Sequence, residues 1–220
     1  MIEYLSREVE LGRIVGPFDN PPFPIFRCSP MGIVPKKTPG KFRTILDLSS
    51  PRGYSVNEFI SKEDFSLSYV SVDKAIDMIM SLGRGCYLSK IDIMDAFRIL
   101  PVLPSQWHLL GMYWDGKYYY DSRLPMGSRS SPYIFDSVTT ALEWICQNNY
   151  ELKNLCHLLD DFFAAELPSE KGNALSILLN VFRLLGVPIA PGKIDGPATI
   201  LEFLGITLDT INFLAFLSAE

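Results

Sequence analysis

Two adjacent aspartates, Asp160 and Asp161, interrupt an apolar run in the segment HLLDDFFAAEL, residues 157–167. Neighbouring carboxylates repel each other and resist burial, so the chain has to expose them or neutralise them. Aspartate suits turns, and the flanking apolar runs suit half-buried strands. The segment therefore predicts a β-hairpin with the acidic pair at its tip. Taken alone, an exposed turn is a sufficient explanation for the two aspartates.

A third carboxylate, Asp92, suggests why the chain has the aspartate pair. In YLSKIDIMDAFRILPV, Asp92 ends an apolar strand and so projects at a sheet edge. If this strand is a neighbour of the hairpin, three carboxylates converge at one place. Hard divalent cations such as Mg²⁺ bind carboxylate oxygens and cancel their repulsion. Two such ions about 4 Å apart can stabilise the attacking and the leaving oxygen of a phosphoryl displacement.

The other elements follow from periodicity and turn residues. Helices are expected at residues 71–83, with Ser71 as N-cap and Gly83 as stop, and at 130–148 and 173–186. A strand is expected at 86–91, and further strands and hairpins at 36–48, at 109–124 around Asp115-Gly116, at 199–209 and at 211–217. This order predicts the α+β class, with one antiparallel sheet and helices on one face.

Length and composition fit a globular protein. The 220 residues are 48% hydrophobic, enough to bury the core of one large domain or one and a half. No apolar run of about 18 residues occurs and the N-terminus is charged, so no membrane segment or signal peptide is expected. The cysteines (Cys28, Cys86, Cys146 and Cys156) form no zinc pattern with the two histidines. We expect reduced thiols, Cys156-His157 in a strand core, and an intracellular location, with cytoplasm or nucleus undecided.

The charge distribution is uneven. The net charge of −5 argues against a general nucleic-acid-binding surface. Residues 21–46, however, contain no acidic residue and five basic ones: Arg27, Lys36, Lys37, Lys41 and Arg43. This arm is either a phosphate-binding segment or a solvated loop.

The motifs together resemble a known family. Asp92 with Phe97, LPMGSRSSPYIF, LLDD, the lysine of APGKIDGP, and EFLGI occur in the order and approximate spacing of reverse transcriptase motifs A to E. MGIVPKKTPGKFRTILDL resembles the fingers hairpin of the same family, and the likeness covers about residues 27–210. SKEDFSLSYVSVDKAI and HLLGMYWDGKYYYDSRLP are most similar to DIRS-type retrotransposons, which encode a tyrosine recombinase.

This resemblance implies the fingers and palm of a right-hand polymerase. The expected parts are an N-terminal arm (1–26), part of the fingers (27–85), a palm with an interleaved fingers segment (86–210) and a C-terminal stub (211–220). Because about ten residues follow motif E, the thumb is expected to be absent. Thumb, RNase H and recombinase regions would then belong to a longer parent polyprotein.

The resemblance also implies catalytic roles. Asp92 and Asp160 would be the main ligands of two Mg²⁺ ions, with Mn²⁺ as an alternative, and Asp161 would assist them. Asp95, one helical turn beyond Asp92, is expected to be a helix cap or a supporting group. Phe97 would exclude a ribose 2′-hydroxyl, unless it is an ordinary core phenylalanine.

Further residues are implied to contact substrates. Arg43, with Lys36 or Lys37, would grip the triphosphate of a deoxynucleotide, and Lys193 would donate a proton to pyrophosphate, unless it is a surface lysine in a Pro-Gly loop. Met126 stands where many relatives have glutamine, and Gly127 beside it would allow close backbone approach to a base. Phe203, Leu204 and Gly205 would form the primer grip, or simply a hairpin.

The function implied is RNA-directed DNA polymerase: nucleotidyl transfer from dNTPs onto a primer paired with an RNA or DNA template. Two alternatives stay open. One is a palm polymerase that copies RNA into RNA, which Phe97 argues against. The other is a catalytically inactive retroelement relic that binds nucleic acid or protein, which Met126 and the expected lack of a thumb favour.

Overall fold

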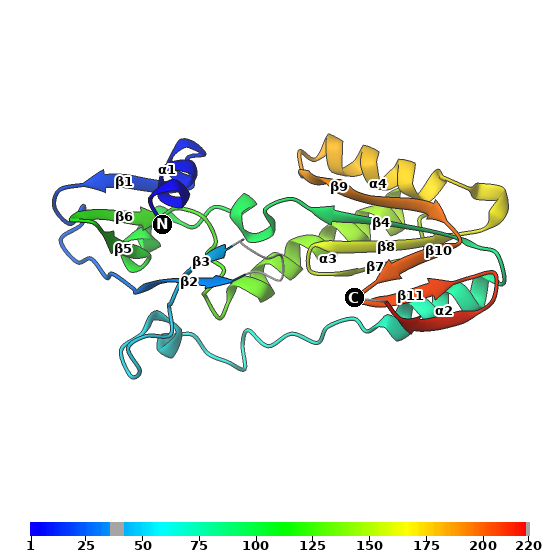
Figure 1. The fold of residues 1–220 in the computed structure, drawn as a ribbon, viewed down its shortest axis with the longest axis horizontal. Helices are drawn as coiled ribbons and strands as arrows, with labels where there is room; N and C mark the ends of the chain where they lie inside the picture. Colours follow the sequence, from blue (N-terminus) through cyan, green and yellow to red (C-terminus); the bar gives the residue numbers. More distant parts are fainter. Residues whose placement is uncertain (36–41, 219–220) are drawn as a thin grey trace. The chain divides into compact units, whose positions relative to one another are not determined.

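The computed structural model describes residues 1–35 and 42–218, with the exception of the Arg43 side chain. The chain divides into two compact units, one formed by Met1–Ser66 and Phe97–Ile134 and the other by Leu67–Ala96 and Phe135–Glu220. Both units are discontinuous in sequence, and each is described by itself below (Figure 1). Among the described helices, none combines the length and apolarity that crossing a membrane requires.

The first unit contains two small antiparallel sheets, ordered β1-β6-β5 and β2-β3. Its elements are α1 Ile2–Glu10, β1 Ile14–Phe18, β2 Met31–Pro35, β3 Phe42–Leu46, β5 Gly111–Trp114, β6 Lys117–Asp121, and the 3-10 helices η1 Val56–Phe59, η2 Ala96–Ile99 and η3 Pro104–Leu109. The helix α3, Ser131–Asn149, begins here and continues into the second unit. Residues 1–18 are thus part of the folded unit, because β1 pairs with β6.

The positions of the hairpins in this unit are explained by their turn residues. Asp115 and Gly116, between β5 and β6, have φ angles of 49° and 75°, and two successive positive φ values match the twist of a two-residue hairpin. The hairpin predicted around Asp115-Gly116 is therefore confirmed. β2 pairs with β3 from Met31↔Leu46 to Pro35↔Phe42. The Pro-Gly turn predicted for this second hairpin lies outside the described residues.

The second unit is built on a four-stranded antiparallel sheet, ordered β7-β8-β4-β9, and a three-stranded sheet, ordered β10-β11-β12 (Figure 1). Its elements are α2 Val72–Leu82, β4 Tyr87–Ile93, β7 Leu155–Leu158, β8 Asp161–Glu166, the 3-10 helix η4 Pro168–Glu170, α4 Asn173–Leu184, β9 Ile189–Ala198, β10 Ile200–Phe203, β11 Ile206–Asp209 and β12 Leu214–Leu217. The α+β class is confirmed, but the expectation of a single sheet is wrong.

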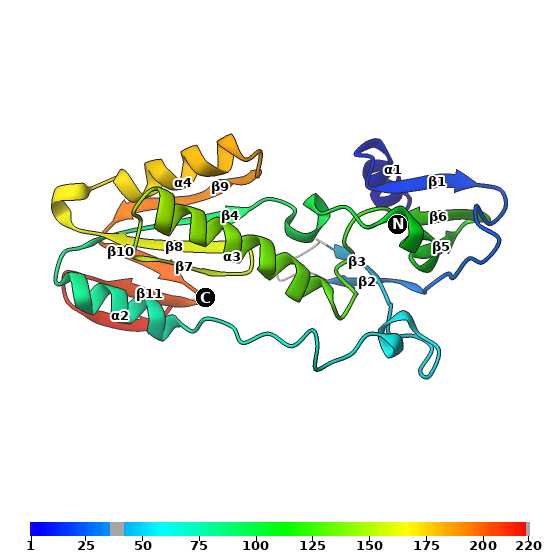
Figure 2. The same cartoon turned by 180° about the vertical axis from the view of Figure 1, so that it is seen from behind.

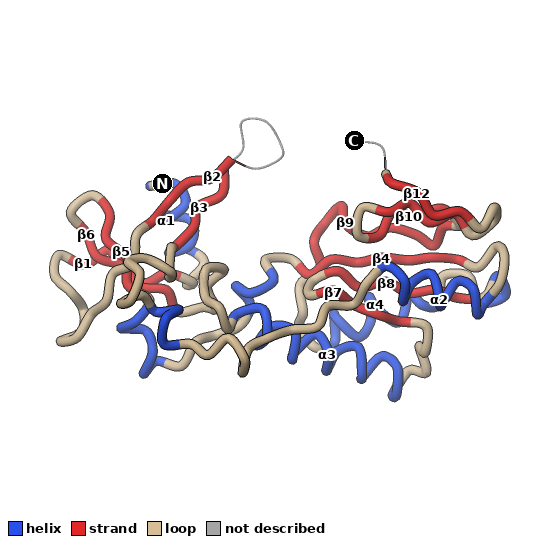
Figure 3. Tube along the Cα trace, turned by 90° about the horizontal axis from the view of Figure 1, so that it is seen from below, coloured by secondary structure: helices blue, strands red, loops and turns tan. Residues whose placement is uncertain are grey.

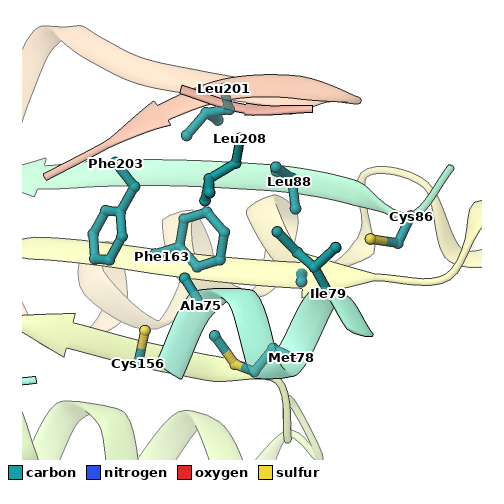
Figure 4. Packing of buried hydrophobic residues seen from close by; sticks show 11 residues of the cluster. Ala75, Met78, Ile79, Cys86, Leu88, Cys156, Phe163, Leu201, Phe203 and Leu208 are labelled. Carbon is teal, nitrogen blue, oxygen red and sulfur yellow. The ribbon is translucent and has the colours of Figure 1, made fainter. Parts of the chain in front are cut away.

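The successive phenylalanines of β8 point to opposite faces of the four-stranded sheet, as the period of a strand requires. Phe163 is fully buried and its ring lies 4.8 Å from that of Phe203 in β10. This cluster also holds Ala75, Met78 and Ile79 of α2 (Figure 4). Burial of each such large side chain contributes about 1.5–3 kcal/mol, enough to fix the register of β8.

The other face of the sheet carries α3 and α4. The Phe162 ring lies 5.0 Å from that of Phe182 in α4, and His157 of β7 stacks on Phe162 and contacts Glu143 of α3. Figure 2 shows α3 and α4 along this face, and Figure 3 shows the β10-β11-β12 sheet on the opposite side. Helices therefore cover both faces, since α2 packs with Phe163, and the expectation of helices on one face only is wrong.

Helix boundaries agree with the sequence prediction. α2 has Ser71 as N-cap and ends at Gly83, whose φ of 89° an L-residue rarely adopts. α3 and α4 lie within one or two residues of their expected ranges. The segment 199–209 folds into two strands, β10 and β11, rather than one. Cys156 and His157 are buried in β7, as expected.

Candidate active site

Three carboxylates meet where β4, β7 and β8 lie side by side. Asp92 in β4 is the direct register partner of Asp161, the first residue of β8. The Asp160 carbonyl, in the turn between β7 and β8, accepts a hydrogen bond from the Ile93 main-chain nitrogen at 2.9 Å. The three residues therefore occupy adjacent backbone positions, although Asp92 lies 68 positions before Asp160 in the sequence.

The position of Asp92 differs slightly from the prediction. It does not end its strand, because β4 continues to Ile93 between β8 and β9. Asp92 lies on the same face as Phe163, since residues at alternate positions of paired strands share a face. Only 5% of Asp92 is exposed to solvent. A buried carboxylate in this place needs a compensating charge.

Burial and mutual repulsion raise the proton affinity of the hairpin carboxyls. Burial raises the pKa of Asp161 to about 6, and the negative charges of Asp92 and Asp160 add to the effect. The pKa of Asp160 is raised as well, first by burial and then by Asp92. Like charges directly opposite each other on paired strands are destabilising. The cluster is thus an electrostatic site that favours bound positive charge.

A lysine supplies part of that charge. Lys193 lies in β9, which pairs with β4, and its ammonium donates a hydrogen bond to Asp92 Oδ2 at 2.5 Å. This bond is the main cause of a raised pKa for the Lys193 ammonium. The segment is a strand rather than a Pro-Gly loop, because β9 runs through residues 189–198. The side chain is nevertheless 59% exposed, so it has room to move.

The donor atoms fit hard divalent cations, which prefer carboxylate oxygens. Within the part of the chain that the structure describes, no three acidic, histidine or cysteine side chains form a ready ligand set. The Lys193 ammonium lies on Asp92 instead. Side-chain rotation of the three aspartates, which start from adjacent backbone positions, would be needed to complete such a set.

The raised pKa of Asp161 predicts a pH-dependent stability. Between about pH 4 and pH 6 the folded chain holds a proton on Asp161 that the unfolded chain releases, so the free energy of unfolding falls as the pH rises through this window. Allowing for solvent screening of a partly exposed group, the loss is about 1–2 kcal/mol. Asp161→Asn should therefore gain stability relative to the parent chain between pH 4.5 and pH 7.

Thermal melts in EDTA at several pH values measure this difference. Asp195→Asn is the matched control, because Asp195 lies on β9 and pairs with Lys90 at 3.4 Å, with a half-exposed side chain. The difference in stability between Asp195→Asn and the parent chain should not change with pH in the way expected for Asp161→Asn. Equal pH slopes for the parent and Asp161→Asn would contradict the repulsion described above.

The residues expected around the nucleotide sugar and base belong to the first unit. Phe97 lies in η2 and is half-buried, and its carbonyl accepts a hydrogen bond from the Leu100 nitrogen at 3.1 Å. Met126 is 53% exposed, so its side chain is available for apolar contact. Asp95, just before this segment, has a positive φ of 57° in a turn.

Gly127 makes a close backbone approach within the first unit. A Cβ at this position would lie 2.2 Å from the carbonyl oxygen of Leu46, so the close backbone approach that requires glycine is to β3. Asn57, which the sequence analysis did not single out, holds the same turn: its side chain donates to the Gly127 carbonyl at 2.9 Å and accepts from the Arg129 nitrogen at 2.8 Å. Asn57 lies in the short helix η1, and its sequence neighbourhood gives no signal of this role.

The expected triphosphate residues can be placed only in part. Arg43 lies in β3, opposite Val34 of β2. Lys36 and Lys37 lie outside the described residues. The basic arm as such therefore stays a prediction.

The three expected primer-grip residues differ in accessibility. Phe203 is fully buried against Phe163, so its side chain supports the core. Leu204 and Gly205 form the turn between β10 and β11, with φ angles of 52° and 78°. Leu204 is half-buried and Gly205 is exposed.

Comparison with known proteins identifies relatives of the whole arrangement. Residues 34–208 match the family model described as reverse transcriptase (RNA-dependent DNA polymerase). The chain is 26% identical over 182 residues to the Pro-Pol polyprotein of simian foamy virus type 1, which covers 82% of this chain and 14% of the polyprotein. It is 26% identical over 215 residues to the Gag-Pro-Pol polyprotein of human T-cell leukemia virus 2, covering 92% of this chain and 13% of that one.

Solved structures show the same fold. A foamy viral protease-reverse transcriptase in complex with double-stranded DNA has a TM-score of 0.76 at 20% identity, covering 99% of this chain and 34% of that one. A foamy viral protease-reverse transcriptase in complex with an RNA/DNA hybrid has a TM-score of 0.70 at 20% identity, covering 93% of this chain and 25% of that one. At this identity the likeness establishes the fold, and the chain spans 34% or less of the length of these proteins.

Proposed function

The chain belongs to the reverse transcriptase (RNA-dependent DNA polymerase) family, and on this basis we propose that it forms the fingers and palm of an RNA-directed DNA polymerase. The likeness to the foamy viral enzymes confirms the fold expected from the sequence. The single observation that carries the proposal is the register pairing of Asp92 with Asp161, which brings Asp160 to the same point. The reaction is nucleotidyl transfer from a dNTP onto a primer 3′-hydroxyl.

The carboxylates are the proposed metal-binding groups. Asp92 and Asp160 would be the main ligands of two Mg²⁺ ions, or Mn²⁺, with Asp161 assisting. When bound, such ions lower the pKa of the primer hydroxyl and neutralise the departing pyrophosphate. Lys193 is held beside these groups by its bond to Asp92, and a positioned ammonium can donate a proton to the leaving group.

The first unit would bind the incoming nucleotide. Arg43 with Lys36 or Lys37 would hold the triphosphate, because guanidinium and ammonium groups pair with phosphate oxygens. Phe97 would exclude a ribose 2′-hydroxyl, and Met126 would make apolar contact with the nucleotide. Gly127 would act indirectly, by letting the 126–129 turn approach β3.

The nucleic-acid partner would be an RNA or DNA template with its primer. The foamy viral structures are complexes with DNA and with an RNA/DNA hybrid, which supports this assignment. Leu204 and Gly205 would contact the primer strand, with Phe203 supporting their turn from the core. The relatives are polyproteins, which supports a longer parent chain, and the thumb, RNase H and recombinase regions of that parent are part of the proposal. The proposed assignment to the DIRS-type subgroup depends only on the sequences of the motifs.

A second candidate, a catalytically inactive relic that binds nucleic acid or protein, is favoured by one observation. Met126 occupies an exposed position where a glutamine amide would offer hydrogen bonds, and methionine offers none of comparable strength. The relic keeps the fold but does not extend primers.

Primer extension distinguishes these candidates. The chain, joined to the thumb region of its parent polyprotein, is given poly(rA)/oligo(dT), dTTP and either Mg²⁺ or Mn²⁺. The polymerase predicts extension that EDTA abolishes and that UTP does not replace. Extension with UTP in preference to dTTP would support an RNA-synthesising polymerase, and no extension with either nucleotide would support the relic.

A further inference from the structure

A buried ion-pair network lies beside the proposed sugar-discriminating residue. Arg98, the residue after Phe97, donates from Nε and Nη2 to Glu8 Oε2 at 3.2 and 3.0 Å. Its Nη1 donates to Asp121 Oδ2 at 2.5 Å. Glu8 comes from the N-terminal helix α1 and Asp121 from the end of β6, so one guanidinium joins three elements of the first unit.

The network is balanced in charge and shielded from water. Arg98, Glu8 and Asp121 are 8%, 6% and 3% exposed. Arg13 lies 3.6 Å from Glu8 Oε1, so two arginines alternate with two carboxylates. Removal of one partner from such a network leaves an uncompensated buried charge, which is strongly unfavourable.

Stability alone is a weak reason for such a network. A well-packed apolar set of similar volume is often as stable as a buried ion pair. Apolar packing was available here, because Leu5 of the same helix is buried with Ile14 and Met112. A guanidinium, in contrast, holds its partners in fixed directions because its donors form a planar fork. The network is therefore suited to holding the elements that it joins in a fixed orientation.

The segment fixed in this way is the one that carries Phe97. Arg98 and Phe97 share the short helix η2. Beyond it, the Leu124 nitrogen donates to the Leu100 carbonyl at 2.9 Å, and the Val102 nitrogen donates to the Ser122 carbonyl at 3.0 Å. The main chain after Phe97 and the side chain of Arg98 are thus both anchored at the end of β6.

We propose that Arg98 is a positioning residue for sugar discrimination: clamped by Glu8 and Asp121, it fixes η2 and thereby the direction in which Phe97 is presented. The N-terminal helix α1 then takes part in the choice of deoxynucleotide over ribonucleotide, although it need not touch the nucleotide. This inference rests on the proposed function. Displacement of a positioned group by about 1 Å can change a rate by up to about a hundredfold.

The test compares dTTP with UTP in primer extension on poly(rA)/oligo(dT), using Arg98→Met and Glu8→Gln in the thumb-containing chain. The readout is the ratio of the two kcat/KM values, because a smaller folded fraction lowers both values equally and leaves their ratio unchanged. We expect Arg98→Met to lower the dTTP preference about tenfold. Glu8→Gln, which keeps an acceptor oxygen, should lower it about threefold in the same direction.

Lys117→Met is the matched control. Lys117 pairs with Asp19 in the same unit, but both side chains of this pair are substantially exposed, so its loss should leave the ratio unchanged. Glu8→Gln decides the question should Arg98→Met fail to fold. Unchanged ratios in active variants would overturn the positioning role alone. An inactive parent chain would overturn the proposed function, and this inference with it.

Discussion

Asp92→Asn is expected to lower primer extension by about a thousandfold. An amide keeps the shape of the carboxylate but removes the charge that holds a divalent cation, and metal ions contribute several kcal/mol to such reactions. Asp92 faces Asp161 across the β4–β8 pair, and the main-chain nitrogen of the next residue, Ile93, donates to the Asp160 carbonyl, so Asp92 lies next to both members of the hairpin pair. Single-turnover extension with dTTP measures the loss.

The stability of the same variant distinguishes a catalytic from a structural aspartate. Asp92 repels Asp160 and Asp161, so its neutralisation should not destabilise the metal-free chain. Lys193 loses its partner but is 59% exposed and can turn to water. We therefore expect activity to fall while the melting temperature is maintained or rises, the trade-off typical of functional sites.

Asp195→Asn serves as the control for this experiment. It removes a carboxylate from β9, in the same sheet, whose partner is Lys90. Its extension rate should stay close to that of the parent chain. Asp92→Asn with the full parent rate would show that the carboxylates do not take part in the reaction, and the polymerase assignment would fail.

Much of the second unit was predictable, because its signals are local. The apolar runs around Asp160 and Asp161 indicated the strands β7 and β8, and Ser71 and Gly83 marked the ends of α2. The meeting of Asp92 with Asp161 was predictable only as a possibility of sheet pairing. The structure supplies the register that makes it specific.

Other features depend on contacts between distant residues and left no local signal. β9 contains Gly192, Gly196 and Pro197, which usually interrupt strands, yet pairing with the central strand β4 overrides this preference, with register shifts where the pattern breaks. The close approach of Gly127 to the Leu46 carbonyl left no local signal, because Leu46 lies 81 positions earlier in the sequence. The partnership of Arg98 with Glu8 was hidden for the same reason.

The second large effect is expected at Phe97, the residue proposed to exclude ribonucleotides. Phe97→Val is expected to raise incorporation of UTP relative to dTTP by roughly tenfold to a hundredfold. Forcing one extra group into a filled apolar site costs about 1–3 kcal/mol, and valine would remove the obstacle that the phenyl ring presents to a 2′-hydroxyl. The dTTP rate should change less, since a deoxyribose does not reach the space that is opened.

Phe65→Val is the control that separates a sugar-discriminating ring from a core ring. Phe65 lies in the same unit, is half-buried, and packs edge-on against Tyr133 with ring centres 5.5 Å apart. Its truncation should cost stability and leave the UTP-to-dTTP ratio unchanged. Should Phe97→Val behave in the same way, Phe97 would be a packing residue, and the preference for deoxynucleotides would have to come from elsewhere in the chain. A changed ratio for Phe97→Val at a comparable loss of stability assigns the ring to substrate choice, because packing alone acts equally on both nucleotides.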